Sequence, residues 1–196
     1  MILRIHAHHR PGGERDSVLQ DGKRLIYQGP LFAVFETDIP LHDGRRKLVS
    51  SIDHRPCISV VPVTERGELL LIRQYRHAVD QVLIEIPAGN MDREGESPEE
   101  CTQRELAEET GFQAGRLIKL FEGYLVPGYG NEYMHYFLAL DLFAASLPPD
   151  EDESIEVIAL PLAEAISMMK RGVIKDSKTA LGICLAAEYL REAKEC

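Results

Sequence analysis

Apolar residues come in short runs along much of the chain, and many of them are β-branched or aromatic. Runs of this length, interrupted by turn residues such as Gly, Pro and Asp, are typical of β-strands. The pattern predicts strands at residues 25–28, 31–38, 47–52, 58–63, 68–75, 82–86, 117–124, 133–140 and 155–160. Helices are predicted at residues 97–110, 162–171 and 177–194. Because strands surround single helices without regular alternation, we expect an α+β fold with a mixed sheet.

The helix predicted at residues 97–110 has clear signals at both ends. Ser97 can cap its first turn, Pro98 suits the first helical position, and Glu100 completes a capping box. Gly111 can take the left-handed conformation that ends a helix. This segment is therefore the most firmly predicted helix of the chain.

Acidic residues are concentrated in and before this helix. Residues 92–109 have a net charge of −6, compared with −10 for the whole chain. Glu105, Glu108 and Glu109 stand at i, i+3 and i+4, so their carboxylates share one helix face. Like charges at that spacing destabilise a bare helix, and a bound cation would reverse the effect. Carboxylate oxygens suit Mg²⁺ and Mn²⁺, so these glutamates are candidate metal ligands, with a solvated acidic face as the alternative.

Composition narrows the class of protein. A length of 196 residues with 44% apolar content suits one globular domain with a small addition. A broad acidic surface repels nucleic acids and anionic membranes, so neither is expected as a partner. No apolar run approaches the roughly 20 residues that cross a bilayer, and we expect a cytoplasmic protein. The cysteines form no CxxC pair and are expected to be reduced thiols rather than zinc ligands: Cys57, Cys101, Cys184 and Cys196.

The acidic helix belongs to a longer pattern. Gly89 precedes Glu96, and the sequence RELAEETGF runs from Arg104 to Phe112. These residues resemble the Nudix box, G-x5-E-x7-R-E-U-x-E-E-x-G-U with U an apolar residue, and every fixed position from Glu96 onward fits. Gly89 lies one residue too far from Glu96, which leaves the role of Glu96 open. The chain is thus similar to the Nudix hydrolases.

The Nudix resemblance implies an α/β/α sandwich with a mixed sheet. It also implies a metal-dependent enzyme that hydrolyses a nucleoside diphosphate linked to another group. Glu105, Glu108 and Glu109 would bind Mg²⁺ or Mn²⁺, and Arg104 would orient a carboxylate of the cluster. Divalent ions neutralise charge on a diphosphate and lower the pKa of the attacking water. Glu108 is also a candidate general base.

Other stretches resemble the ADP-ribose pyrophosphatase branch of this family. By that resemblance Arg76 and Glu85, in the segments RQYR and EIPAG, would bind substrate. The backbone carbonyl of Ala88 would bind a metal ion. The loop VPGYGNE would contribute Pro127 and Glu132 to substrate binding. The expected reaction is hydrolysis of ADP-ribose to AMP and ribose 5-phosphate.

Two segments near the C-terminus have counterparts in the same branch. The acidic loop EDES offers Glu151 and Glu153 as candidates for the general base, because a glutamate on a mobile loop can close over substrate. Residues 172–179 match an element that opens the last helix, and we interpret them as structural.

The resemblance also predicts how the chain is divided. Residues 1–56 would form a small N-terminal β domain, followed by the Nudix hydrolase domain at residues 57–196. The N-terminal strands imply a domain-swapped homodimer in which each subunit lends residues to the other's site. Arg46 or Arg45 would then reach the substrate bound by the other subunit.

Two other functions are compatible with the same motifs. Nucleotide-sugar pyrophosphatases, which act on compounds such as GDP-mannose, share the box, the PG…E loop and the acidic loop. A catalytically inactive domain that senses ADP-ribose-like ligands is the second alternative. Such domains usually lose acids from the box, whereas Glu105, Glu108 and Glu109 are all present. These motifs do not decide the preferred substrate, the metal or the number of ions.

Overall fold

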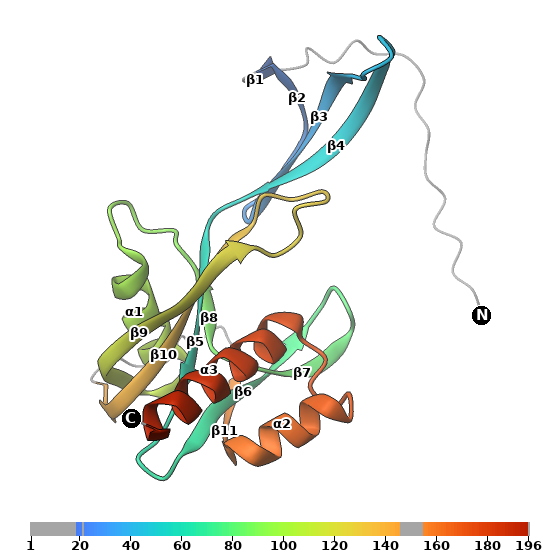
Figure 1. Cartoon of the computed structure of the whole chain (residues 1–196). Coiled ribbons are helices and arrows are strands. Elements are labelled where there is room, and N and C mark those ends of the chain that lie inside the picture. Colours follow the sequence, from blue (N-terminus) through green and yellow to red (C-terminus); the bar gives the residue numbers. More distant parts are fainter. Residues whose placement is uncertain (1–18, 21, 146–154, 196) are drawn as a thin grey trace, which may run out of the picture. The chain divides into compact units, whose positions relative to one another are not determined.

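The computed structural model describes residues 19–20, 22–145 and 155–195, in two compact units. One unit ends at Asp53 and the other begins at His54. The first contains a four-stranded sheet in the order β1-β2-β3-β4 (Figure 1). Its strands are β1 (Leu19–Gln20), β2 (Lys23–Gln28), β3 (Phe32–Pro40) and β4 (Arg46–His54).

The second unit contains two sheets and three helices. One sheet has the order β8-β5-β10-β9 and the other the order β11-β6-β7. The strands are β5 (Cys57–Pro62), β6 (Glu68–Arg76), β7 (Gln81–Glu85), β8 (Ala88–Asn90), β9 (Phe112–Tyr124), β10 (Tyr133–Ala144) and β11 (Ile155–Pro161). The helices are α1 (Pro98–Thr110), α2 (Leu162–Lys170) and α3 (Ser177–Glu195). β5 pairs with β10 in parallel and with β8 in antiparallel fashion, so the sheet is mixed, as predicted.

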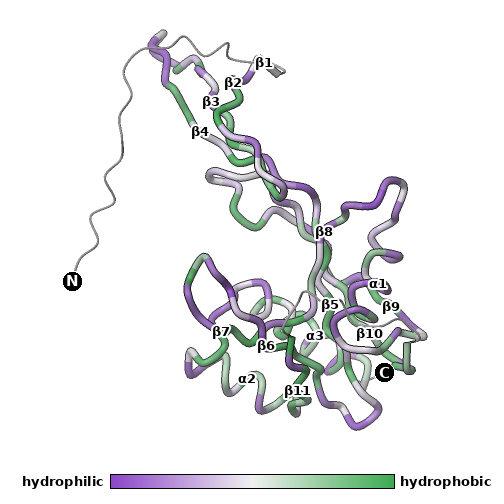
Figure 2. The backbone as a smooth tube through the Cα atoms, turned by 180° about the vertical axis from the view of Figure 1, so that it is seen from behind, coloured by the Kyte–Doolittle hydropathy of each residue, from purple (hydrophilic) through white to green (hydrophobic). Residues whose placement is uncertain are grey.

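Strand β5 is buried along its whole length because helices cover both faces of its sheet. On one face Ile58 and Val60 share a core with Leu106 of α1. On the other face Val61 belongs to a larger core with Ile183 of α3. Figure 2 shows hydrophobic colouring along β5, consistent with a strand that is covered on both sides. This layering is the α/β/α sandwich that the sequence predicted.

Most predicted elements are present with boundaries close to the expected ones. Two differences matter for the site. β9 begins at Phe112, directly after Gly111, and not at residue 117, so helix α1 leads straight into a strand. The short strand β8 was not predicted, and it pairs Ala88 with Ser59 of β5. β8 thereby anchors the segment before α1 to the central sheet.

Candidate metal and substrate site

Helix α1 begins and ends where the local sequence predicts. The hydroxyl of Ser97 accepts a hydrogen bond from the amide of Glu100 at 3.2 Å, and the Glu100 carboxylate accepts one from the amide of Ser97 at 2.9 Å. Pro98 occupies the first turn. Gly111 has φ of 75° and donates its amide to the carbonyl of Ala107 at 2.9 Å. With both ends fixed, the carboxylates along α1 keep a defined register against β8.

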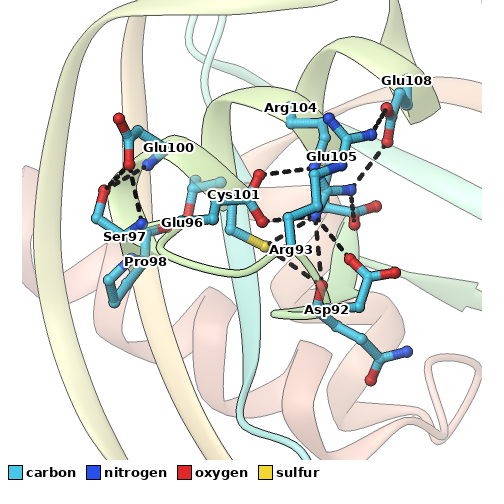
Figure 3. Close-up of polar contacts among 12 residues, drawn as sticks. Asp92, Arg93, Glu96, Ser97, Pro98, Glu100, Cys101, Arg104, Glu105 and Glu108 are labelled. Atoms are coloured by element: carbon cyan, nitrogen blue, oxygen red, sulfur yellow. Dashed lines mark hydrogen bonds and ion pairs between the residues drawn. The ribbon is translucent and has the colours of Figure 1, made fainter.

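Arg104 lies at the centre of the acidic cluster, with a side chain that is 10% exposed (Figure 3). Its Nε and Nη2 donate to the two carboxylate oxygens of Glu96, at 2.8 and 2.9 Å. Its Nη1 contacts Glu105 and lies 3.1 Å from Oε2 of Glu108, and Nη2 lies 3.4 Å from Asp92. Hydrogen bonds from Arg104 hold the pKa of Glu96 below its usual range. Despite the extra residue after Gly89, the structure therefore gives Glu96 a partner within the box.

Gly89 makes room for Glu105. A Cβ atom at Gly89 would lie 1.9 Å from Cδ of Glu105 and 2.2 Å from its Oε1, so only glycine allows this approach. Burial raises the pKa of Glu105 to about 7, against the attraction of Arg104 and with the repulsion of Glu108. Arg104 is shared by the carboxylates of Glu96, Glu105 and Glu108, so the cluster offers several oxygen ligands around a single guanidinium. That donor set fits a divalent cation held by oxygen ligands.

Glu109 and Ala88 come together at the edge of this cluster. Glu109 is 9% exposed, and its Oε2 accepts a hydrogen bond from the amide of Ala88 at 3.1 Å. Oε1 of Glu108 lies 3.3 Å from Nη2 of Arg93, at a more open position. The four predicted metal ligands are therefore gathered between one face of α1 and the start of β8: Ala88, Glu105, Glu108 and Glu109.

Arg76 and Glu85 form a charged pair next to this cluster. Nε and Nη2 of Arg76 donate to the two carboxylate oxygens of Glu85, at 2.8 and 2.7 Å. Lys178 also contacts Glu85. The Glu85 carboxylate is 2% exposed, and although burial alone would raise its pKa, Arg76 and Lys178 hold the pKa below its usual range. Hydrogen bonds to Glu85 raise the pKa of Arg76, and the charge of Glu109 adds to this effect, which places the guanidinium within electrostatic reach of the cluster.

The segment at residues 172–179 connects helix α3 to this pair. Asp176 accepts hydrogen bonds from the amide of Thr179 at 2.9 Å and from its hydroxyl at 2.5 Å. Thr179 in turn accepts one from the amide of Ile86 at 2.9 Å. Lys178 belongs to the site although no role is predicted for it from sequence: its ammonium lies 2.8 Å from Asp176 and also contacts Glu85. Its signal is the DSKT sequence at the start of α3.

The loop between β9 and β10 contains two of the predicted substrate-binding residues. Pro127 is exposed in a turn that the amide of Gly130 closes on the carbonyl of Val126 at 2.9 Å. Glu132 is half-buried, and its Oε1 lies 3.6 Å from Sγ of Cys57. The structure thus places Glu132 against the start of β5.

The other predicted site residues are not among those that the structure brings to the acidic cluster or the loop after β9. Arg46 belongs to the first unit, where its Nε donates to Oδ2 of Asp38 at 2.6 Å. Glu151 and Glu153 lie outside the residues that the structure describes.

Comparison with known proteins places this geometry in a family. The NUDIX domain model matches residues 53–180, and the chain belongs to the Nudix family. It is 33% identical over 163 residues to an ADP-ribose pyrophosphatase of Bacillus subtilis (strain 168), which covers 82% of this chain and 88% of that protein. It is 44% identical over 124 residues to a GDP-mannose pyrophosphatase of Yersinia enterocolitica, which covers 59% of this chain and 64% of that protein.

A solved structure agrees with the sequence relatives. A crystal structure of an ADP compounds hydrolase superposes with a TM-score of 0.79 at 27% identity, over 87% of this chain and 92% of that one. The chain therefore has the Nudix fold and is a Nudix pyrophosphohydrolase, a class that generally depends on divalent metal ions. Among the described residues, no helix is long and apolar enough to span a membrane.

Proposed function

We propose that this enzyme hydrolyses the diphosphate bond of ADP-ribose to AMP and ribose 5-phosphate, using Mg²⁺ or Mn²⁺. The observation that carries the proposal is the convergence of Glu105, Glu109 and Ala88, with an arginine-braced Glu108, between α1 and β8. The substrate is supported by the ADP-ribose pyrophosphatase that aligns over 88% of its own length. The ADP compounds hydrolase, with its TM-score of 0.79, points to the same class of substrate.

The residues of the cluster have distinct proposed tasks. A bound divalent ion would neutralise charge on the diphosphate and lower the pKa of the attacking water. The carbonyl of Ala88 and the carboxylates of Glu105, Glu108 and Glu109 would hold the ion. Arg104 is fixed by its two hydrogen bonds to Glu96, so it keeps the carboxylate of Glu108 in place. Such oriented ligands are what a rigid metal site requires.

Arg76 is the proposed anchor for the substrate. Its side chain is 38% exposed, and Glu85 holds its guanidinium through two short hydrogen bonds. Because Lys178 and burial fix Glu85, the guanidinium is preorganised, and a planar charged group of this kind suits a diphosphate. Pro127 and Glu132 would contribute to substrate recognition from their loop.

Three further residues have proposed roles that depend on the family resemblance. Glu151 and Glu153 are the candidates for the general base, and Glu108 is the alternative inside the box. Arg46 would act on the substrate bound by the other subunit of a homodimer.

The apolar side chains that the first unit exposes are evidence for this dimer. Five large side chains of this small sheet and its turns are exposed: Ile26, Tyr27, Leu31, Phe32 and Leu48. Five large exposed apolar side chains on so small a sheet are typical of an interaction surface. We therefore propose a homodimer formed through this unit.

Hydrolysis of a nucleotide sugar is the second candidate. The GDP-mannose pyrophosphatase of Yersinia enterocolitica shows higher identity, 44%, but over a shorter stretch of 124 residues. Similarity over this shorter stretch is evidence that the two proteins share the chemistry of the Nudix box, and weaker evidence that they share a substrate.

A substrate panel tests the proposal. The full chain is assayed with ADP-ribose, GDP-mannose, diadenosine phosphates, NADH and dGTP, each with Mg²⁺ and with Mn²⁺, and the products are identified. We expect ADP-ribose to give the highest kcat/KM, with AMP and ribose 5-phosphate as products. A higher kcat/KM for GDP-mannose would contradict the substrate assignment. Binding of ADP-ribose without turnover of any substrate would contradict the enzyme assignment and favour a sensor.

A further inference from the structure

Three acceptor oxygens and one ring nitrogen surround the buried thiol of Cys57 at the start of β5. Its Sγ lies 3.2 Å from Oδ1 of Asn90, 3.4 Å from the carbonyl of Arg55, 3.6 Å from Oε1 of Glu132 and 3.7 Å from Nδ1 of His54. A thiol carries one proton and is a weak donor, so it can satisfy only one of these acceptors. Cys57 is 5% exposed, which limits the hydrogen bonds that water can supply. The arrangement therefore concentrates lone pairs around a sulfur atom, and a cation would complement it.

The spacing of the donor atoms matches a tetrahedral metal site. Zinc bonds of about 2.3 Å to sulfur and about 2.0–2.1 Å to nitrogen or oxygen place tetrahedral ligand atoms about 3.5 Å apart. The sulfur of Cys57 lies 3.7 Å from the nitrogen of His54 and 3.6 Å from the oxygen of Glu132. The donor atoms of these three residues all lie within 4.8 Å of one another. The backbone is thus already arranged for three ligands.

We propose that His54, Cys57 and Glu132 form a second metal site, for a thiolate-binding divalent transition ion such as Zn²⁺, with Oδ1 of Asn90 as the fourth ligand. The combination of thiolate, imidazole and carboxylate favours such an ion over Mg²⁺, which prefers oxygen ligands alone. This proposal does not depend on which substrate the enzyme hydrolyses, but it gives Glu132 a metal-binding role in place of the substrate contact proposed above.

Binding of a metal ion would displace one proton from Cys57 and move another on His54. The Cys57 thiol would lose its proton to solvent as the metal–sulfur bond forms. Nδ1 of His54, which lies 2.8 Å from the carbonyl of Arg55, would give up that hydrogen bond, and the neutral ring would carry its proton on Nε2. Burial raises the pKa of the thiol to about 12, so an ion must bind sulfur strongly to displace the proton. This requirement again selects Zn²⁺ and related ions.

The proposed site is linked to the acidic cluster through one residue. The side-chain oxygen of Asn90 faces Cys57, whereas its backbone carbonyl lies 3.3 Å from Nη2 of Arg104. The loop that carries Glu132 is held to the same place, because the side-chain oxygen of Asn131 accepts a hydrogen bond from the amide of His54 at 2.7 Å. An ion at this site would therefore tie the loop after β9 to β5 and β8.

A cobalt titration tests the site. The full chain, in excess Mg²⁺ to occupy the carboxylate cluster, is titrated with Co²⁺, whose bond to a thiolate gives a charge-transfer absorption in the near ultraviolet. Wild type is compared with Cys57→Ser, with His54→Asn and with Cys184→Ser, a matched control at an exposed cysteine of α3. Circular dichroism verifies the fold of each variant.

The expected results separate this site from other thiols. Wild type and Cys184→Ser should bind one Co²⁺ per chain with the thiolate band, and Zn²⁺ should abolish the band by displacement. Cys57→Ser should lose the band, and His54→Asn should bind Co²⁺ about 10- to 100-fold more weakly, as loss of a ligand or of its supporting contacts implies. No band in wild type, a band retained by Cys57→Ser, or wild-type affinity in a folded His54→Asn would each overturn the proposal. None of these readouts depends on hydrolytic activity.

Discussion

Gly89 shows how a single residue without a side chain decides where a metal-binding carboxylate lies. A Cβ atom at this position would lie 1.9 Å from Cδ of Glu105, and the obstacle is the end of a flexible side chain. We therefore expect Gly89→Ala to keep the fold while it displaces the Glu105 carboxylate. The predicted result is at least a ~10-fold loss of kcat/KM, in line with misplacing a ligand or its support. Steady-state kinetics and thermal unfolding measure the two effects, and wild-type kinetics in a folded Gly89→Ala would contradict this role.

The buried pair of Glu85 and Arg76 predicts how stability depends on pH. The folded-state pKa of Glu85 lies below the ordinary value of 4.5, so ionised Glu85 stabilises the fold above that pH. That contribution is lost as the pH falls below 4.5 through the folded pKa. At pH 7 we expect Glu85→Gln to lower the free energy of unfolding by about 3 kcal/mol, the lower end for breaking a buried ion pair.

The free energies of unfolding of wild type and Glu85→Gln, compared over a range of pH, test the role of this charge. Below pH 4.5 the difference between wild type and Glu85→Gln should shrink, because the protonated glutamic acid then resembles glutamine. Urea unfolding of both proteins between pH 3 and pH 7 measures it. A difference that stays constant over this range would show that the charge of Glu85 does not stabilise the fold.

At the scale of elements, the ends of α1 fix the register of the Nudix box. The capping box joins Ser97 and Glu100 through two reciprocal hydrogen bonds. Ser97→Ala removes one of them and should lower the free energy of unfolding by about 1 kcal/mol. Ser167→Ala, at an exposed position within α2, is the control and should change it by less than about 0.5 kcal/mol. Equal effects of the two substitutions in urea unfolding would contradict the assigned cap.

The elements that sequence could predict are those with strong local signals. α1 has caps at both ends, and β5 is a continuous apolar run, so both were predicted within a residue or two. The strand β8 was missed because its three residues carry no apolar period and pair only through the backbone with β5. The early start of β9 at Phe112 was missed because the predicted strand began with the apolar run at residue 117, whereas the chain turns at Gly111 directly into the sheet.

The residues of the candidate sites likewise fall into those that sequence predicts and those that it does not. Motif spacing within one helix placed Glu105, Glu108 and Glu109 on a shared face. Contacts between distant segments had no such signal, and the group formed by Cys57 and Glu132 joins residues far apart in sequence. The absence of a CxxC pair therefore argued against zinc ligands, although the fold brings a histidine and a carboxylate to Cys57. Only tertiary structure reveals such a cluster.

In the whole molecule, the two units suggest two different roles, dimerisation for the first and catalysis for the second. The unit that ends at Asp53 exposes apolar side chains, and the unit that begins at His54 holds the acidic cluster. We expect the full chain to be a dimer and a chain that lacks residues 1–53 to be monomeric, with at least a ~10-fold lower kcat/KM, because it lacks Arg46 and the proposed interface. Sedimentation velocity, circular dichroism and kinetics measure these properties. A truncated chain that is monomeric and fully active would contradict the domain-swapped dimer.

We propose that the carboxylates of α1 hold the metal ion for hydrolysis of ADP-ribose. The most direct test of this proposal is the kcat for ADP-ribose with Mg²⁺ in wild type and in Glu109→Gln, which removes a charge but keeps the size of a side chain that is 9% exposed. The control is Glu188→Gln, at an exposed glutamate of α3. We expect a loss of at least ~10²-fold for Glu109→Gln, no change for Glu188→Gln, and no turnover by wild type in excess chelator. A loss below threefold for Glu109→Gln, or full turnover with chelator, would contradict it.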